Sequence, residues 1–125
     1  MNKQLMDIVL PSLARRLHRQ LERYRAGELD DSQFNRRFEA VLEKQYSWLA
    51  KQGVSEAEAA IAVHAAVLVL SGPGMRAEAA EVGLPLEVIE QRAIRTVADE
   101  IAENYEVDQG RVLQKITSIV AQYAE

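Results

Sequence analysis

The sequence predicts an all-α fold, a compact bundle of five to six helices. Apolar residues recur every three or four positions along nearly the whole chain, which is the spacing of one helix face. Glycine and proline stand at plausible breaks between these stretches. At 125 residues the chain is long enough to bury one core. We therefore expect a single domain made of a hairpin (1–53), a central helix (54–71) and a C-terminal part (75–125).

The first helix is predicted over residues 3–25. Its apolar stripe consists of Leu10, Leu13, Leu17, Leu21 and Tyr24. Pro11 lacks a backbone N–H and would clash with the carbonyl group of Asp7 in a regular helix. Either the helix kinks at Pro11, or residues 1–9 form a separate turn and Pro11 opens the main helix.

The second helix is predicted to end at Gly53 and to begin at one of three favourable N-cap residues, Asp30, Asp31 or Ser32. Its apolar stripe consists of Phe34, Phe38, Val41, Leu42 and Leu49. Because the linker between the first two helices is short, we expect them to pair as an antiparallel hairpin.

The third helix opens with Ser55 and Glu58, a capping box in which each side chain satisfies a backbone group at the other residue. From residue 59 to residue 70 it is apolar on every side, so we expect it at the centre of the fold, with the hairpin packed on it. His64 is the polar residue of this stretch. We interpret it as a core histidine bonded to a neighbouring carbonyl or hydroxyl, with a ligand pocket as the alternative.

Residues 71–74, Ser-Gly-Pro-Gly, form the sharpest break in the chain. We interpret them as a hinge or helix C-cap rather than as a loop that cradles an anion. Three further helices are predicted after it, over 75–82, over 85–105 and from Asp108 onward. Pro85 suits the first turn of the second of these, and Asp108 is a good N-cap for the last.

Composition excludes several classes of site. The chain has no cysteine, which removes disulfides, thiolate zinc sites and cysteine nucleophiles. Its two histidines, His18 and His64, lie in no Glu-x-x-His pattern, and no serine stands in a recognisable catalytic set. We therefore predict no catalytic residues, no metal and no cofactor. The longest apolar run is too short for a bilayer and no signal peptide is apparent, so we expect a cytoplasmic protein with no membrane partner.

The net charge of −4 is unevenly divided along the chain. Residues 1–53 carry ten basic and seven acidic side chains, a net +3, whereas residues 54–125 carry five and twelve, a net −7. The candidate basic face consists of Arg15, Arg16, Arg19, Arg23, Arg36 and Arg37. Such a face suits a phosphate backbone, an acidic protein surface or an anionic membrane. The alternatives are a solvated face, or pairing with the acidic half of this or another copy.

One stretch resembles a helix-turn-helix unit. Ala79, Gly83 and Ile89 have the spacing at which a small residue lets two helices approach, a glycine turns the chain and an apolar residue fixes the second helix. Arg92 and Arg95 are the basic residues of the second helix. Its first turns, however, carry Glu87 and Glu90, whose carboxylates would repel phosphates. We therefore favour an ordinary helical corner over a DNA reader.

Gln45 falls within the apolar stripe of the second helix, beside Trp48. A buried polar residue of this kind can fix the register of an interface between copies, whereas at a face edge it would simply meet water. Together these features predict a small non-enzymatic interaction or regulatory protein that acts through protein–protein contacts. Its expected partner is itself, as a homodimer, or another protein. The alternative function is a helix-turn-helix-like DNA-binding regulator that uses residues 75–95.

Overall fold

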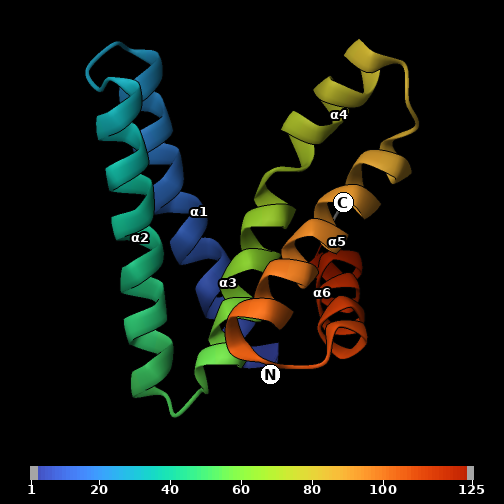
Figure 1. Cartoon of the computed structure of the whole chain (residues 1–125). Coiled ribbons are helices and arrows are strands. Elements are labelled where there is room, and N and C mark those ends of the chain that lie inside the picture. The colour runs from blue at the N-terminus through green and yellow to red at the C-terminus, as the bar shows by residue number, and fades with distance from the viewer. Residues whose placement is uncertain (1–2, 124–125) are drawn as a thin grey trace. The chain divides into compact units, whose positions relative to one another are not determined.

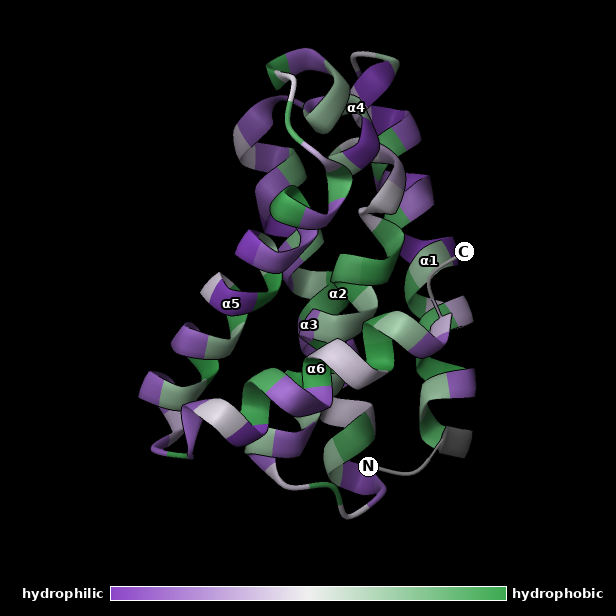
Figure 2. Ribbon diagram, turned by 90° about the vertical axis from the view of Figure 1, so that its right-hand side faces the viewer, coloured by the Kyte–Doolittle hydropathy of each residue, from purple (hydrophilic) through white to green (hydrophobic). Residues whose placement is uncertain are grey.

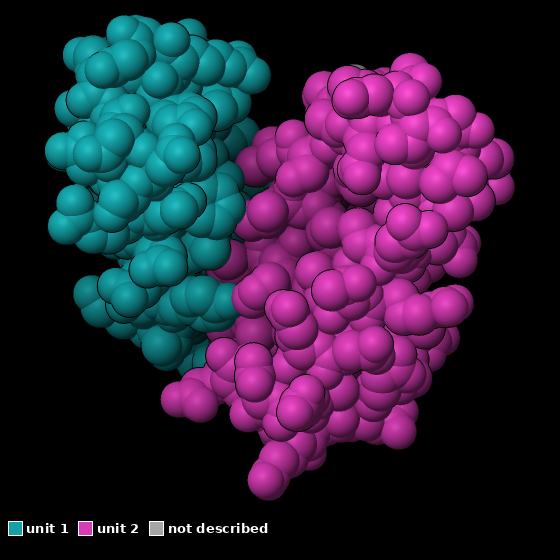
Figure 3. All heavy atoms as spheres, turned by 45° about the horizontal axis from the view of Figure 1, so that its top comes forward, with its two compact units in different colours: residues 1–55 teal, residues 56–125 magenta. Residues whose placement is uncertain are grey.

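The computed structural model describes residues 3–123, and its fold is all-α as predicted (Figure 1). The chain forms six helices, α1 (Lys3–Arg25), α2 (Asp31–Lys51), α3 (Glu56–Leu70), α4 (Gly72–Val82), α5 (Leu86–Tyr105) and α6 (Gln109–Tyr123). No strand occurs between residues 3 and 123. The helices group into two compact units, unit 1 (1–55) and unit 2 (56–125), each of which is described by itself (Figure 3).

Unit 1 is a hairpin of α1 and α2, which pack against each other. Helix α1 runs unbroken through Pro11, so the chain is not divided there. The exposed position of Pro11 lets its ring project from the helix without displacing a packed neighbour. The buried apolar side chains of the two helices are Met6, Val9, Leu13, Val41 and Leu49.

The turn of the hairpin is fixed by polar contacts at the start of α2. Of the three candidate N-caps, Asp30 is the one used, and it forms a capping box with Gln33. Asp30 Oδ1 accepts a hydrogen bond from the Gln33 backbone N–H at 2.7 Å, and Gln33 Oε1 accepts one from the Asp30 N–H at 2.9 Å. The Tyr24 hydroxyl donates to Asp31 at 2.5 Å, and this bond raises the pKa of Tyr24.

Unit 2 is built around α3, which contacts α4, α5 and α6. Eight residues of α3 are buried, five of them alanines, which permit close approach of neighbouring helices. By contrast, each turn of α5 combines hydrophobic and hydrophilic residues (Figure 2). Helix α3 has no polar stripe because neighbouring helices of unit 2 cover it on several sides. The predicted packing of the hairpin on α3 stays a prediction.

Helix α4 begins three residues earlier than the sequence suggested. The predicted start at Met75 is wrong, because Gly72, Pro73 and Gly74 already belong to the first turn of α4. Pro73 fits there since the first turn of a helix needs no N–H from it. Ser71 alone separates α3 from α4, and the two helix axes are bent by 56°. The break at 71–74 is thus a one-residue joint rather than a four-residue loop.

The Ser71 joint keeps its backbone groups hydrogen-bonded. The Ser71 N–H donates to the carbonyl oxygen of Val67 at 2.9 Å, and the Ser71 hydroxyl donates to the same oxygen at 2.7 Å. The Met75 N–H in turn donates to the Ser71 carbonyl at 3.0 Å. The helical ladder therefore continues on both sides of the bend.

Two polar contacts organise the other end of unit 2. Asp108 caps α6 as predicted, its Oδ2 accepting from the Arg111 N–H at 2.9 Å. Lys115 of α6 pairs with Glu58 in the first turn of α3. The hydrogen bond from the Lys115 ammonium lowers the pKa of the Glu58 carboxyl.

Between residues 3 and 123, no single helix is both long enough and apolar enough to cross a bilayer. Helices α3 and α4 together reach that length and composition, but only across their bend. By itself α3 has 15 residues, fewer than the ~20 that span a hydrocarbon core.

Candidate functional site

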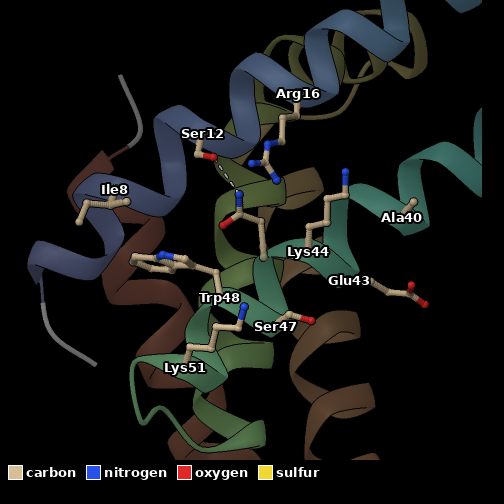
Figure 4. Close-up of a pocket in the computed structure, with 10 residues that line it drawn as sticks. Ile8, Ser12, Arg16, Ala40, Glu43, Lys44, Ser47, Trp48 and Lys51 are labelled. Atoms are coloured by element: carbon tan, nitrogen blue, oxygen red, sulfur yellow. Dashed lines mark hydrogen bonds between the residues drawn. The ribbon is translucent and has the colours of Figure 1, made fainter.

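The main hollow of unit 1 is a groove of about 600 Å³ between α1 and α2 (Figure 4). Helix α1 contributes Ile8, Ser12 and Arg16 to it. Helix α2 contributes Ala40, Glu43, Lys44, Gln45, Ser47, Trp48 and Lys51. We call this hollow the hairpin groove. Two helices touch along a single line, so a groove stays open beside the line where α1 and α2 pack.

The polar base of the hairpin groove is a hydrogen bond between its two helices. Gln45 is only 4% exposed, and its Nε2 donates to Ser12 Oγ at 3.0 Å. The bond joins residues 33 positions apart and is drawn as a dashed line in Figure 4. Gln45 therefore does not meet water at a face edge, because its amide is paired inside unit 1. Its predicted place in an interface between copies stays a prediction.

Apolar side chains form one end of the hairpin groove. Trp48, the one tryptophan in the chain, is half-buried and its ring points from α2 toward α1 (Figure 4). Ile8 on α1 is 53% exposed, the second-highest fraction among the large hydrophobic side chains exposed in the described part of the chain. These two side chains offer apolar surface to a bound molecule.

Basic side chains border the hairpin groove away from Trp48 and Ile8, and they also border a neighbouring groove. A second, smaller groove of about 260 Å³ shares Arg16, Ala40 and Lys44 with the first. The two grooves together are bordered by five cations, which we call the cationic face: Arg16, Arg19, Arg37, Lys44 and Lys51. In the part of the chain that the structure describes, none of the five forms an ion pair. Glu43 is the single carboxylate at the groove edge, and its side chain points away from α1 (Figure 4).

Gln20 adds an unmet hydrogen-bonding group to the second groove. Its side-chain Oε1 is buried and accepts no hydrogen bond in the structure. A buried acceptor without a partner costs about 1–3 kcal/mol.

The structure brings half of the predicted basic residues together. Arg16, Arg19 and Arg37 belong to the cationic face, whereas Arg15, Arg23 and Arg36 border neither groove. Sequence reasoning missed Lys44 and Lys51. The signal was present, because residues 37, 44 and 51 are seven apart, and that spacing keeps side chains on one face of α2 over four turns.

Helices α4 and α5 meet at the predicted corner. Ala79 and Ile89 are each 6% exposed, so the small residue and the later apolar residue both lie at the helix contact. Gly83 adopts a left-handed conformation (φ 72°), and its N–H donates to the Ala79 carbonyl at 3.0 Å. Only glycine adopts this conformation without cost.

The polar side of this corner is mixed in charge. Arg92 and Arg95 are exposed and border a shallow hollow of about 510 Å³ along α5. Glu87 and Asp99 border the same hollow. The arrangement places carboxylates on both sides of the two arginines, which weakens attraction to a phosphate backbone.

The histidines are placed apart from these surfaces. His64 is half-buried, with its Nδ1 2.8 Å from the Ala60 carbonyl oxygen, and it borders none of the three hollows. His18 pairs with Glu22 one turn away at 3.0 Å, with both side chains exposed. Within residues 3–123, no three histidine, aspartate or glutamate side chains gather as metal ligands.

The chain matches no family model, no curated protein and no solved structure. Its function is therefore inferred from its own surfaces. Two of them stand out, the cationic face with its groove in unit 1 and the helical corner at Gly83 in unit 2.

Proposed function

We propose that this chain is a small non-enzymatic interaction protein, whose hairpin groove and cationic face bind an acidic protein segment. The observation that supports this proposal is the combination of five unpaired cations with the apolar surface of Trp48 and Ile8. Arginine and tryptophan are the residue types that dominate binding energy at protein interfaces. Cations at the rim accelerate encounter with an acidic partner and fix its register.

A protein segment fits this surface better than a simple polyanion does. The apolar end of the groove suits an aliphatic or aromatic side chain, which a phosphate backbone lacks. The proposed partner therefore combines carboxylates with an apolar anchor.

The proposal is tested with a synthetic amphipathic peptide that carries glutamates and leucines at helical spacing. Trp48 is the reporter, because its emission changes when its surroundings lose water. We expect saturable binding that weakens as salt rises, since exposed charges are screened. A variant with Arg16→Glu and Lys44→Glu should bind at least about tenfold more weakly.

The matched control reverses two exposed cations outside the grooves, Arg25→Glu and Arg36→Glu, with the same change in net charge. This control should keep most of the affinity. Equal weakening by both variants would show that total charge, and not the cationic face, governs binding. A flat Trp48 signal with no binding by calorimetry would contradict the proposal.

The second candidate is a DNA-binding regulator that uses residues 75–95. It is favoured by the left-handed turn at Gly83, with Ala79 and Ile89 packed on either side of it. Binding to a duplex oligonucleotide should then be strong at low salt and lost in a variant with Arg92→Glu and Arg95→Glu. Unchanged binding by that variant would remove residues 75–95 as the reader. A cytoplasmic location stays part of both proposals.

A further inference from the structure

We infer that the hairpin groove and cationic face of one copy bind the α4–α5 corner of a second copy, so that copies associate head to tail. This inference rests on the proposed function, since it names the partner of the same surface. The additional observations are the exposed apolar side chains and the carboxylates of the α4–α5 corner.

The α4–α5 corner exposes apolar side chains. Val82, Leu84 and Val88 are 54%, 39% and 40% exposed, and they are half of the large hydrophobic residues exposed in the described part of the chain. They lie within seven positions of the sequence, on both sides of the left-handed turn at Gly83. Exposed apolar side chains that gather in one place mark an interaction site more often than scattered ones do.

The same corner carries acidic charge. Glu81 and Glu87 are exposed and stand next to Val82 and Val88 in the sequence. We call Glu81, Val82, Leu84, Glu87 and Val88 the acidic corner. It offers carboxylates together with aliphatic side chains, the chemistry that the hairpin groove calls for. Arg92 and Arg95 follow further along α5, so the side of α5 beyond the corner is mixed in charge, whereas the five residues of the acidic corner include no cation.

The charges of the two surfaces are complementary. Unit 1 carries ten basic and seven acidic side chains, and unit 2 carries five and twelve. The cations of the groove have no ion-pair partner in residues 3–123, and the apolar side chains of the corner are exposed there. Both surfaces are thus unused in the single chain. Pairing them between copies would cover Trp48 and Ile8 with Val82 and Val88, and would place Glu81 and Glu87 among the cations.

The contact would be heterologous, because it joins two different surfaces. Each copy then keeps one free groove and one free corner, so that association extends into chains or closes into a ring. A two-fold dimer would instead use the same surface of both copies. This difference can be tested by mixing variants.

The test uses two variants that each lose one surface. The groove variant carries Arg16→Glu and Lys44→Glu, together with Trp48→Phe to remove its fluorescence. The corner variant carries Val82→Ser and Val88→Ser and keeps Trp48. Of the five mutated positions, Arg16, Lys44, Val82 and Val88 are exposed, and half-buried Trp48 is replaced by another aromatic residue, so both variants should fold, and circular dichroism checks this.

The wild-type chain should sediment faster as its concentration rises, and this shift should weaken with added salt. Each variant alone should remain a monomer at concentrations where the wild type associates, with self-affinity at least about tenfold weaker. The equimolar mixture should form a heterodimer that grows no further, because only one productive pair of surfaces remains. The Trp48 signal, which then comes from the corner variant alone, should change on mixing.

A control variant with Val107→Ser removes an exposed valine of unit 2 outside the acidic corner. It should associate like the wild type. A wild-type chain that stays monomeric at all concentrations would overturn the inference, as would a mixture that stays monomeric or a groove variant that still associates. If the acidic peptide binds the groove while the wild type stays monomeric, the proposed function stands and self-recognition is wrong. If neither occurs, both fail.

Discussion

Unit 1 consists of two long helices of 23 and 21 residues, whereas unit 2 consists of four helices of 11 to 20 residues. Of the buried apolar residues in the described chain, sixteen lie in unit 2 and six in unit 1. Unit 2 surrounds an all-apolar helix with three others, whereas unit 1 leaves two helices with a groove and a row of cations between them. The comparison indicates that most of the buried apolar core belongs to unit 2, whereas the groove that we propose as a binding surface belongs to unit 1.

The largest expected effect is in the core of unit 2. Ile116 on α6 is 0% exposed, so Ile116→Ala should leave a cavity and lower the free energy of unfolding by about 2–4 kcal/mol. Urea denaturation followed by circular dichroism measures this loss. The exposed neighbour Ser118 provides the control, since Ser118→Ala should change stability by less than about 0.5 kcal/mol. Equal effects of the two changes would contradict the assignment of the core to unit 2.

A smaller effect is expected at the base of the hairpin groove. Ser12→Ala removes the acceptor of the buried Gln45 amide and should cost about 1–2 kcal/mol in unfolding free energy. Ser47→Ala, at an exposed position of the same groove, should be nearly neutral. Adding Gln45→Met to Ser12→Ala should restore part of the loss, because no polar group is then left unpaired. If Ser12→Ala costs nothing, the hydrogen bond does not support the groove.

The glycines at the two ends of α4 should respond differently to substitution by alanine. Gly83→Ala should destabilise the protein by about 1 kcal/mol, because a side chain at φ 72° is strained even though the space around it is open. Gly74→Ala, in the first turn of α4 with equally open space, should be neutral or stabilise by up to about 0.5 kcal/mol. Thermal melts of the two variants distinguish them. If both substitutions destabilise the protein to the same extent, the left-handed backbone conformation of Gly83 is not the cause of the loss.

The smallest effect is expected at the Glu58–Lys115 pair. Because this pair lowers the pKa of Glu58, it stabilises the folded chain above the ordinary glutamate pKa of ~4.3, and the contribution is lost as pH falls through the lowered value. Glu58→Gln should therefore cost about 0.5 kcal/mol at neutral pH and close to nothing in strong acid. Denaturation at the two pH values measures the difference. A cost that persists unchanged in acid would mean that charge plays no part.

Helix periodicity was sufficient to predict most of the fold. The stripes of α1 and α2, the apolar composition of α3, and the start signals Pro85 and Asp108 each predicted an observed helix. The start of α4 could not be predicted, because the Gly-Pro-Gly run is equally suited to a loop and to an exposed first helical turn. Local sequence rules do not separate these two outcomes. The neighbouring helix α3 and the hydrogen bonds of Ser71 decide between them.

The candidate site was predicted only in part. The arginines of α1 were predicted because they lie close together in the sequence. The lysines of α2 were missed although their seven-residue spacing is visible, and the partner of Gln45 has no local signal. Ser12 and Gln45 meet only because the hairpin sets the register of α1 against α2, and no local pattern contains that register. The groove likewise depends on how two helices pack, which side-chain spacing does not specify.

The one-residue joint at Ser71 also bears on how the chain tolerates added sequence. A peptide inserted after Ser71 would break the hydrogen bond from the Met75 N–H to the Ser71 carbonyl, and with it the start of the helical ladder of α4. The exposed turn at Gly27, which joins α1 to α2, has no such ladder to carry through. An epitope tag or a fused domain placed at the Gly27 turn should therefore be accepted, whereas the same insertion after Ser71 should yield unfolded protein.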